Sequence, residues 1–255
     1  MSANRATDAH RGAHPVHHGG FLITEALLIV AILALGLVVK NHPQPLPGDV
    51  EIELAVQHLL LPHVALAQLI EIPSTINWPN PAGGTVIVVI VTLLLLRRWL
   101  DALVAFFVTA MGDLSSFLAN QVVQRPRPTG HGITVLKQIT TYFSFPSGHV
   151  VHVFGFFGLL IFLSYQTDRY PALLRVLRGL LFLLMVLIAP SRIMEGEHWP
   201  SDVLEGMLFG LFWLLLGIHL YHWASHRWPS LLAADERQGQ ETPLMRPPRE
   251  RRAVP

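Results

Sequence analysis

The sequence predicts an all-α membrane protein, a polytopic helical bundle with six transmembrane helices and an interfacial helix between the first and the second. Two observations favour this class. Of the 255 residues, 51% are hydrophobic and 14% are charged, and the mean hydropathy of +0.45 exceeds that of a typical water-soluble domain of this size. Several apolar stretches also approach the roughly 20 residues that a helix needs to cross a bilayer. A soluble enzyme is therefore not expected.

The first two expected spans cover residues 21–39 and 82–96. A cleavable signal peptide is the alternative for the first span. We favour a retained anchor because the preceding segment is polar and rich in histidine, and Lys40 follows the apolar stretch. The valines and isoleucines of the second span would suit a buried strand, but a helix fits this context better. Four further spans are expected at residues 99–118, 149–165, 179–189 and 203–221, with residues 173–178 leading into the fifth.

The segments outside these spans fall into two kinds. Residues 49–70 carry apolar side chains at near-helical spacing, with Pro62 as a kink, which favours an interfacial helix over a solvated loop. The tails at residues 1–20 and 225–255 flank a membrane domain at residues 21–224 and are expected to be disordered. The histidines of the first tail could bind a metal ion, but an unstructured tail is the favoured interpretation.

The basic residues predict the orientation of the bundle. They gather before the first span, between the second and third, between the fourth and fifth, and after the sixth. Because short cytoplasmic loops are enriched in Lys and Arg, these segments and both termini are expected in the cytoplasm. The loops at residues 40–81, 121–146 and 190–201 then share the opposite face.

Charge and cysteine content exclude several kinds of partner and site. With 18 Lys and Arg against 17 Asp and Glu, the chain has no overall field that would attract nucleic acid. The absence of cysteine removes disulfides, thiolate nucleophiles and cysteine-based metal sites. A metal ion could be held only by histidine and carboxylate.

Two of the outer loops carry polar residues that a simple membrane anchor would not need, and they are the candidate site. Three helix ends should meet there. Gln124–Pro128 closes the third span, Phe145–His149 opens the fourth, and Ser191, Arg192, His198 and Asp202 lead into the sixth.

The arginines favour an anion as the ligand. A guanidinium offers a fork of donors that matches phosphate oxygens, so Arg127 and Arg192 converging across the bundle would form a phosphate clamp. The alternative for either residue alone is anchoring to lipid headgroups. For Arg125 the two interpretations are balanced, because only one of the two Arg-Pro pairs needs to point inward.

The start of the fourth span adds backbone donors and a histidine. Ser147 can cap the helix while free amide groups face an anion, and Gly148 lets the backbone approach closely. A plain helix cap explains both residues equally well. It does not explain His149, although a single histidine here is more often interfacial than catalytic.

His198 and Asp202 are four residues apart at the start of the sixth span. On a helix they share a face, so the carboxylate is expected to bond to one imidazole nitrogen and raise the basicity of the other, as a histidine nucleophile requires. Simple ion pairing at a helix start is the alternative for this pair alone. With Ser191, Arg192 and the other clusters on the same face, we favour a catalytic pair.

Four acidic residues lie within expected spans, where a charge is costly unless it is paired or near an end. One of them, Asp113, could meet an arginine near the site, but a structural pair is the favoured interpretation. The four residues are Glu25, Asp101, Asp113 and Glu205.

These motifs resemble those of the type 2 phosphatidic acid phosphatase superfamily, membrane lipid phosphatases that share a core with vanadium haloperoxidases. The family's second and third signatures are complete here, as Pro146 to His149 and as Ser191, Arg192, His198 and Asp202. The first signature keeps Arg127-Pro128 but has Asn120 where the family has lysine. Asn120 would still donate a hydrogen bond to phosphate, and Arg125 is a candidate for the missing charge. The resemblance covers about residues 97–221.

The resemblance implies a mechanism without metal or cofactor. His198 attacks the phosphorus of a lipid phosphomonoester or diphosphate and forms a phosphohistidine, which water hydrolyses. Asp202 orients His198, and His149 protonates the leaving oxygen. The phosphoryl oxygens are bound by the side chains of Arg127, Arg192, Ser147 and Ser191 and by the backbone amide of Gly148.

The resemblance also sets the expected substrates and compartment. Undecaprenyl diphosphate, phosphatidylglycerol phosphate, phosphatidic acid and lipid A phosphates are candidates, and the sequence does not choose among them or set the oligomeric state. A bacterial inner membrane with the site on the periplasmic face is expected. A catalytically silent lipid-phosphate-binding member, motivated by Asn120, and a lipid phosphotransferase are the alternatives, and a haloperoxidase is disfavoured.

Overall fold

A computed structural model gives the arrangement of residues 18–77, 79–137, 142–167 and 170–232. Every regular element in these ranges is a helix, which confirms the all-α class. Most of the predicted N-terminal tail and residues 233–255 lie outside the described residues. The elements are α1 (His18–Asn41), α2 (Asp49–Leu60), α3 (Val64–Ile76), α4 (Pro79–Leu95), α5 (Trp99–Val123), α6 (Gly148–His152), a π-helical turn (Val153–Phe157), α7 (Gly158–Ser164), α8 (Pro171–Met194), α9 (Pro200–Arg227) and a 3-10 turn (Pro229–Leu231).

Four helices of the described chain are long and apolar enough to cross a membrane, namely α1, α5, α8 and α9. The other two expected spans form shorter apolar helices, α4 and the continuous Gly148–Ser164 helix. The protein is therefore a multi-pass membrane protein.

Several helices extend beyond their predicted limits; α5, for example, continues to Val123 instead of residue 118. α8 begins at Pro171, shortly before the predicted lead-in at residues 173–178, and it ends at Met194. Within it, Arg178 donates to the Ser164 hydroxyl and lies over the ring of Tyr165, 3.6 Å from its centroid. A guanidinium held in this way can sit on a membrane helix. α9 continues to Arg227, so the helix reaches into the segment predicted as a tail.

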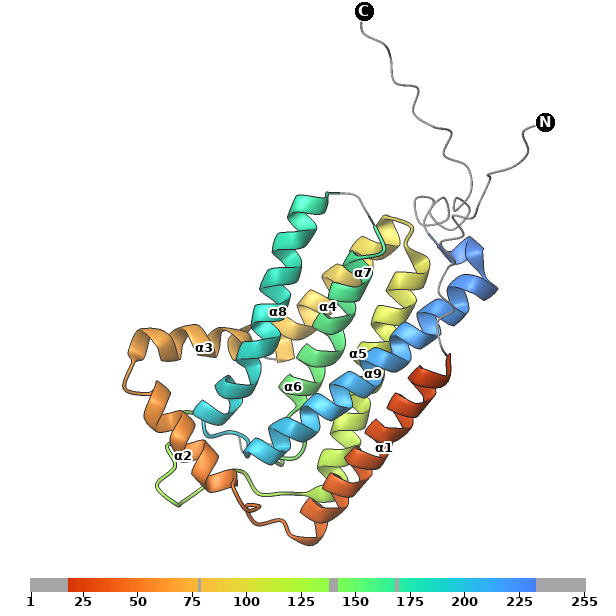
Figure 1. Cartoon of the computed structure of the whole chain (residues 1–255). Coiled ribbons are helices and arrows are strands. Elements are labelled where there is room, and N and C mark those ends of the chain that lie inside the picture. The colour runs from red at the N-terminus through yellow and green to blue at the C-terminus, as the bar shows by residue number, and fades with distance from the viewer. Residues whose placement is uncertain (1–17, 78, 138–141, 168–169, 233–255) are drawn as a thin grey trace, which may run out of the picture.

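The core of the bundle forms where α9 packs diagonally against α1, α5 and α6 (Figure 1). Leu100, Val104 and Val108 of α5 pack with Leu159 and Leu163 of the Gly148–Ser164 helix in one buried cluster. Glycine allows the close approach. A Cβ at Gly210 of α9 would collide with the side chain of Phe154, a contact typical of small residues at membrane helix interfaces.

The acids in the spans have different surroundings. Glu25 of α1 lies 3.2 Å from the imidazole of His219 on α9. Asp101 pairs with Arg98 at 2.5 Å, whereas the carboxylate of Glu205 is buried without a hydrogen bond inside the described structure.

The large apolar side chains of α1, such as Leu27 and Leu33, are exposed, as a lipid-facing surface requires.

The segment predicted as one kinked interfacial helix is two helices. α2 ends at Leu60 and α3 begins at Val64, because Pro62 cannot donate a backbone hydrogen bond and interrupts the ladder. α2 also turns its polar side inward, where Asp49, Glu53 and Gln57 are buried, while Ile52 and Leu59 are exposed. The apolar side of α2 is thus free to meet lipid.

The polar side of α2 holds the loop that follows α5. The Gln57 amide donates to the carbonyl of Thr134 at 2.7 Å and accepts from its N–H at 2.9 Å. The same amide donates to the carbonyl of Met194, at the end of α8, at 3.2 Å. α2 therefore holds the loop after α5 and the segment after α8 in place relative to the bundle.

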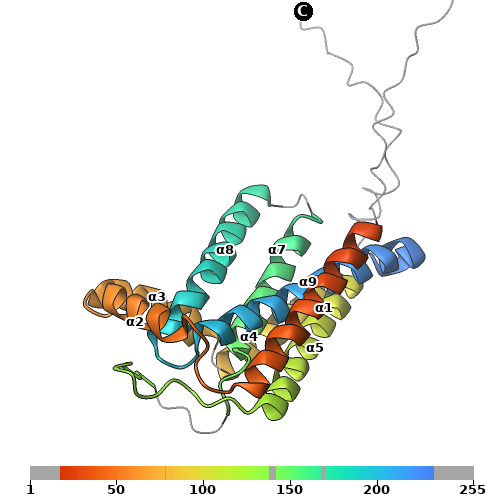
Figure 2. The ribbon, with the colours of Figure 1, turned by 60° about the horizontal axis from the view of Figure 1, so that its bottom comes forward.

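The outer loops meet at one end of the bundle. Figures 1 and 2 show that α1, α5 and α8 end there, and that α6 and α9 begin there, away from the first turn of α1 and the last turn of α9. The loops predicted to share one face therefore lie together.

Candidate active site

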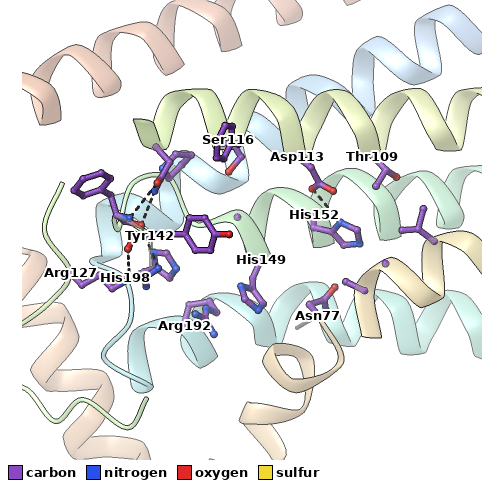
Figure 3. A pocket seen from close by; sticks show the side chains of 18 of the residues that line it. Asn77, Thr109, Asp113, Ser116, Arg127, Tyr142, His149, His152, Arg192 and His198 are labelled. Atoms are coloured by element: carbon purple, nitrogen blue, oxygen red, sulfur yellow. Dashed lines mark hydrogen bonds and ion pairs between the residues drawn. The ribbon is translucent and has the colours of Figure 1, made fainter. Parts of the chain in front are cut away.

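A pocket of about 830 Å³ opens among α4, α5 and α6 at this end of the bundle (Figure 3). Six of the predicted site residues line it and four do not. The lining residues are Asn120, Arg127, Gly148, His149, Arg192 and His198, and the four others are Arg125, Ser147, Ser191 and Asp202.

His198 is held as a neutral imidazole at the pocket wall. Its Nδ1 lies 2.6 Å from the carbonyl oxygen of Ser144. A carbonyl can only accept, so Nδ1 carries the proton and Nε2 keeps a free lone pair. Burial lowers the pKa of His198 well below 6.5, and the charges of Arg127 and Arg192 lower it further. A neutral imidazole with a free nitrogen is the form that a nucleophile needs.

Asp202 does not bond to His198, contrary to the prediction. As the third residue of α9, it closes the helix start by accepting the N–H of Trp199 at 3.0 Å, and this turns the carboxylate away from the imidazole. Its Oδ2 instead accepts a hydrogen bond from the hydroxyl of Ser144. Ser144 thus links the two residues, because its carbonyl holds His198 and its hydroxyl binds Asp202. No sequence signal pointed to this serine.

Arg125 does not face the pocket. Its guanidinium is fully buried and forms ion pairs with Asp49 of α2 at 2.7 Å and with Asp202 at 2.6 Å. It also donates to the hydroxyl of Ser201 at 2.7 Å. Because these bonds hold the guanidinium outside the pocket lining, Arg125 does not replace the charge of the family lysine at the pocket.

Asn120, at the lysine position, uses its amide to hold the chain around Ser144. Its Nδ2 donates to the carbonyls of Phe143 at 2.7 Å and Phe145 at 3.2 Å, and its Oδ1 accepts from the N–H of Phe143 at 3.3 Å. Both donors are therefore already used. Asn120 fixes the segment that carries Ser144, which in turn holds His198.

The two arginines of the predicted clamp both reach the pocket. Arg127 donates to the carbonyls of Tyr142 at 3.1 Å and Glu197 at 2.7 Å. Arg192 is buried and pairs with Glu195 at 2.6 Å and with Glu197. The carboxylate of Glu197 also lies 3.9 Å from Arg127, so it contacts both guanidinium groups. This acid orients the clamp, and the sequence did not indicate it.

The start of α6 and the last turn of α8 carry three buried polar groups of the predicted site. The Nε2 of His149 and the hydroxyls of Ser147 and Ser191 are buried, and none makes a hydrogen bond within the described structure. Ser147 occupies the cap position of α6, but its hydroxyl does not make the predicted cap bond. Gly148 follows it at the pocket wall.

Comparison with known proteins identifies the family of the region that carries the predicted site residues. The model of the PAP2 superfamily matches residues 99–226. Lipid A 1-phosphatase of Rhizobium johnstonii is 30% identical over 124 residues, which are 46% of this chain and 46% of that protein. Undecaprenyl-diphosphatase of Sulfolobus acidocaldarius is 30% identical over 121 residues, which are 46% of this chain and 53% of that protein. The chain thus spans about half the length of the curated relatives it matches.

The fold also matches a solved structure. The crystal structure of a transmembrane PAP2-type phosphatidylglycerolphosphate phosphatase from Bacillus subtilis aligns with a TM-score of 0.66. The alignment covers 78% of this chain and 96% of that chain, at 20% sequence identity. The two proteins therefore share a transmembrane fold.

Proposed function

Because the chain belongs to the PAP2 superfamily of membrane phosphatases, we propose that it hydrolyses a phosphomonoester or diphosphate on a lipid through a phosphohistidine at His198. The observation that carries this proposal is the buried, neutral imidazole of His198, with its proton on Nδ1, beside two arginines. The names of the relatives support a lipid phosphate as substrate.

The proposed reaction has two steps. In the first, Nε2 of His198 attacks phosphorus, the bond to the leaving oxygen breaks, and His149 donates a proton to that oxygen. In the second, His149 takes a proton from water, the water oxygen attacks phosphorus, and the P–N bond breaks to release phosphate. Arg127 and Arg192 stabilise the charge on the phosphoryl oxygens in both transition states.

The pocket suits an amphiphilic substrate. Arginine and histidine line one end, whereas Val86 and Ile87 of α4 and Phe117 of α5 line its apolar wall. A lipid could keep its tail among these helices and present its phosphate to His198.

We further propose that all six apolar segments cross the membrane and that the site faces the periplasm of a bacterial inner membrane. The distribution of arginine supports this orientation, because the end of the bundle away from the site carries Arg97 and Arg98 between α4 and α5, and Arg175 and Arg178 in the first turns of α8. Both termini would then lie in the cytoplasm.

Asn120 supports a second candidate, a catalytically silent member that binds lipid phosphates. Its amide donors are used by backbone carbonyls, so it does not supply the lysine charge of the family. The intact arrangement of His149 and His198 favours the enzyme, since a binding protein does not need a nucleophile with a fixed tautomer. A lipid phosphotransferase would use the same residues with another acceptor.

Turnover tests the proposal. Phosphate release from a panel of lipid phosphates is measured with detergent-solubilised protein, in the presence of EDTA, for wild type and His198→Ala. His58→Ala, at an exposed histidine of α2, is the matched control. We expect release that survives EDTA, persists in His58→Ala and disappears in His198→Ala. Absence of release from every lipid would overturn the proposal in favour of the silent member.

A further inference from the structure

The end of the pocket away from His198 contains an acid and a histidine that the proposed mechanism does not use. Asp113 of α5 and His152 of α6 line this end, and their side chains point toward each other (Figure 3). The Asp113 Oδ1 lies 3.4 Å from Nδ1 of His152. Thr109, one turn before Asp113 on α5, also lines the pocket.

Asp113 lies deep in a span, where a carboxylate is costly unless it is paired. It lies seven residues before Asn120 on α5, which places it about 10 Å deeper along the helix, at 1.5 Å per residue. Its side chain is 55% exposed, whereas the span acids Glu25 and Asp101 are buried. Ionisable groups at such depth usually mark a substrate path.

The carboxylate of Asp113 has unused hydrogen-bonding capacity that faces the pocket. Within the described residues its one side-chain hydrogen bond is to the imidazole of His152. A carboxylate accepts about four hydrogen bonds, so most of its acceptor sites remain open to a ligand.

The distance from the reaction centre fits the part of the substrate next to the phosphoester. His149, which faces the leaving oxygen in the proposed mechanism, is three residues before His152 on the same helix, a separation of about 4.5 Å along the axis. A group attached within a few bonds of the leaving oxygen would therefore reach Asp113 and His152.

Building on the proposed function, we propose that Asp113 and His152 select the substrate by binding an uncharged hydroxyl or amide donor next to the phosphoester. A carboxylate accepts from such donors and repels a second phosphate at the same place. The pocket would thus favour phosphomonoesters on a sugar, glycerol or amide-bearing lipid over polyprenyl diphosphates. The alternative is a purely structural Asp–His pair.

Binding of non-hydrolysable analogues tests this inference independently of turnover. The ligands are dodecylphosphonate, 2-hydroxydodecylphosphonate and an alkyl methylenediphosphonate, and Kd is measured by calorimetry in detergent. For wild type we expect the hydroxyl to tighten binding about tenfold, since a hydrogen bond to a charged group has roughly this effect. The diphosphonate should bind no better than dodecylphosphonate.

Two variants separate hydrogen bonding from charge. The hydroxyl ratio is Kd for dodecylphosphonate divided by Kd for 2-hydroxydodecylphosphonate. Asp113→Leu should bring this ratio close to one and leave Kd for dodecylphosphonate within about threefold of the wild-type value. Asp113→Asn should keep part of the hydroxyl preference and tighten the diphosphonate about tenfold, because the amide removes the repulsion. Leu114→Ala, at an exposed neighbour on α5, is the matched control and should leave every Kd unchanged.

The outcomes distinguish this inference from the proposed function. A hydroxyl ratio near one in wild type, or an equal ratio in wild type and Asp113→Leu, would overturn the inference and assign a structural role to the pair. A ratio that depends on Asp113 in a protein that hydrolyses no lipid would support the inference and overturn the proposed enzyme activity.

Discussion

Replacing Ser144 by alanine tests how Asp202 reaches His198. The Ser144→Ala variant keeps the backbone carbonyl that accepts Nδ1–H of His198, but it removes the hydroxyl that binds Asp202. Both Ser144 and Asp202 are fully buried, so water cannot replace the lost bond. If Asp202 acts through Ser144, the variant should lose much of what Asp202 contributes to catalysis.

The magnitude follows from the type of bond. A hydrogen bond to a charged group contributes about 1.5–3 kcal/mol, which corresponds to roughly 10- to 150-fold in rate. Part of this energy stabilises the fold, so we expect kcat/KM of Ser144→Ala to fall about tenfold. Asp202→Asn should fall further, because it also weakens the ion pair with Arg125.

A double-mutant cycle decides whether Asp202 acts on His198 through Ser144 or directly. kcat/KM for phosphate release is measured for wild type, Ser144→Ala, Asp202→Asn and the double variant. Action through Ser144 predicts strongly non-additive effects, with the double variant close to Asp202→Asn alone. Additive effects would refute the reasoning and indicate that Asp202 orients His198 directly. Ser225→Ala, at a buried serine bonded to the carbonyl of His222, controls for general destabilisation and should keep its kcat/KM.

Three further predictions follow from the structure. Asn120→Ala should lower kcat/KM about tenfold in initial-rate assays, since the amide holds Phe143 and Phe145; unchanged activity would contradict this role. Burial, with the charges of Asp202 and Asp49, raises the pKa of Glu53 to about 8. Because this folded-state pKa exceeds the ordinary 4.5, stability should decline as pH rises from about 4.5 to 8 and then level off. Glu53→Gln should make that decline in Tm smaller, and a parallel decline in both proteins would disprove the assignment. Finally, because the pKa of His198 lies well below 6.5, the acid limb of the kcat/KM profile attributable to this residue should lie below pH 6.5, and a limb above it would contradict a buried neutral imidazole.

The sequence predicted which helix ends meet, but not the bonds made there. Apolar stretches located each helix, and the order of the motifs placed His149, Arg127, Arg192 and His198 around one pocket. The bond between His198 and Asp202 was inferred from spacing alone. It was wrong because the start of α9 uses the carboxylate for its own capping, a competition that spacing does not reveal.

Residues without a motif were the hardest to predict. Ser144 acts partly through its carbonyl, which every residue possesses, and Glu197 acts through contacts that depend on the path of the loop. α2 was expected to present an apolar face to the membrane. Its opposite face, with Asp49 and Gln57, became important only when the tertiary structure placed it against the outer loops.

The ion pairs of Arg125 also bear on how the chain is made. Arg125 is 76 residues from Asp49 and 77 from Asp202, and it bonds to both. During translation Asp49 is therefore made long before Arg125, and Asp202 is made only when synthesis reaches α9. In biosynthetic terms the site closes late, because Arg125 can pair with Asp49 once both have been made, but its bond to Asp202 has to wait until α9 has begun.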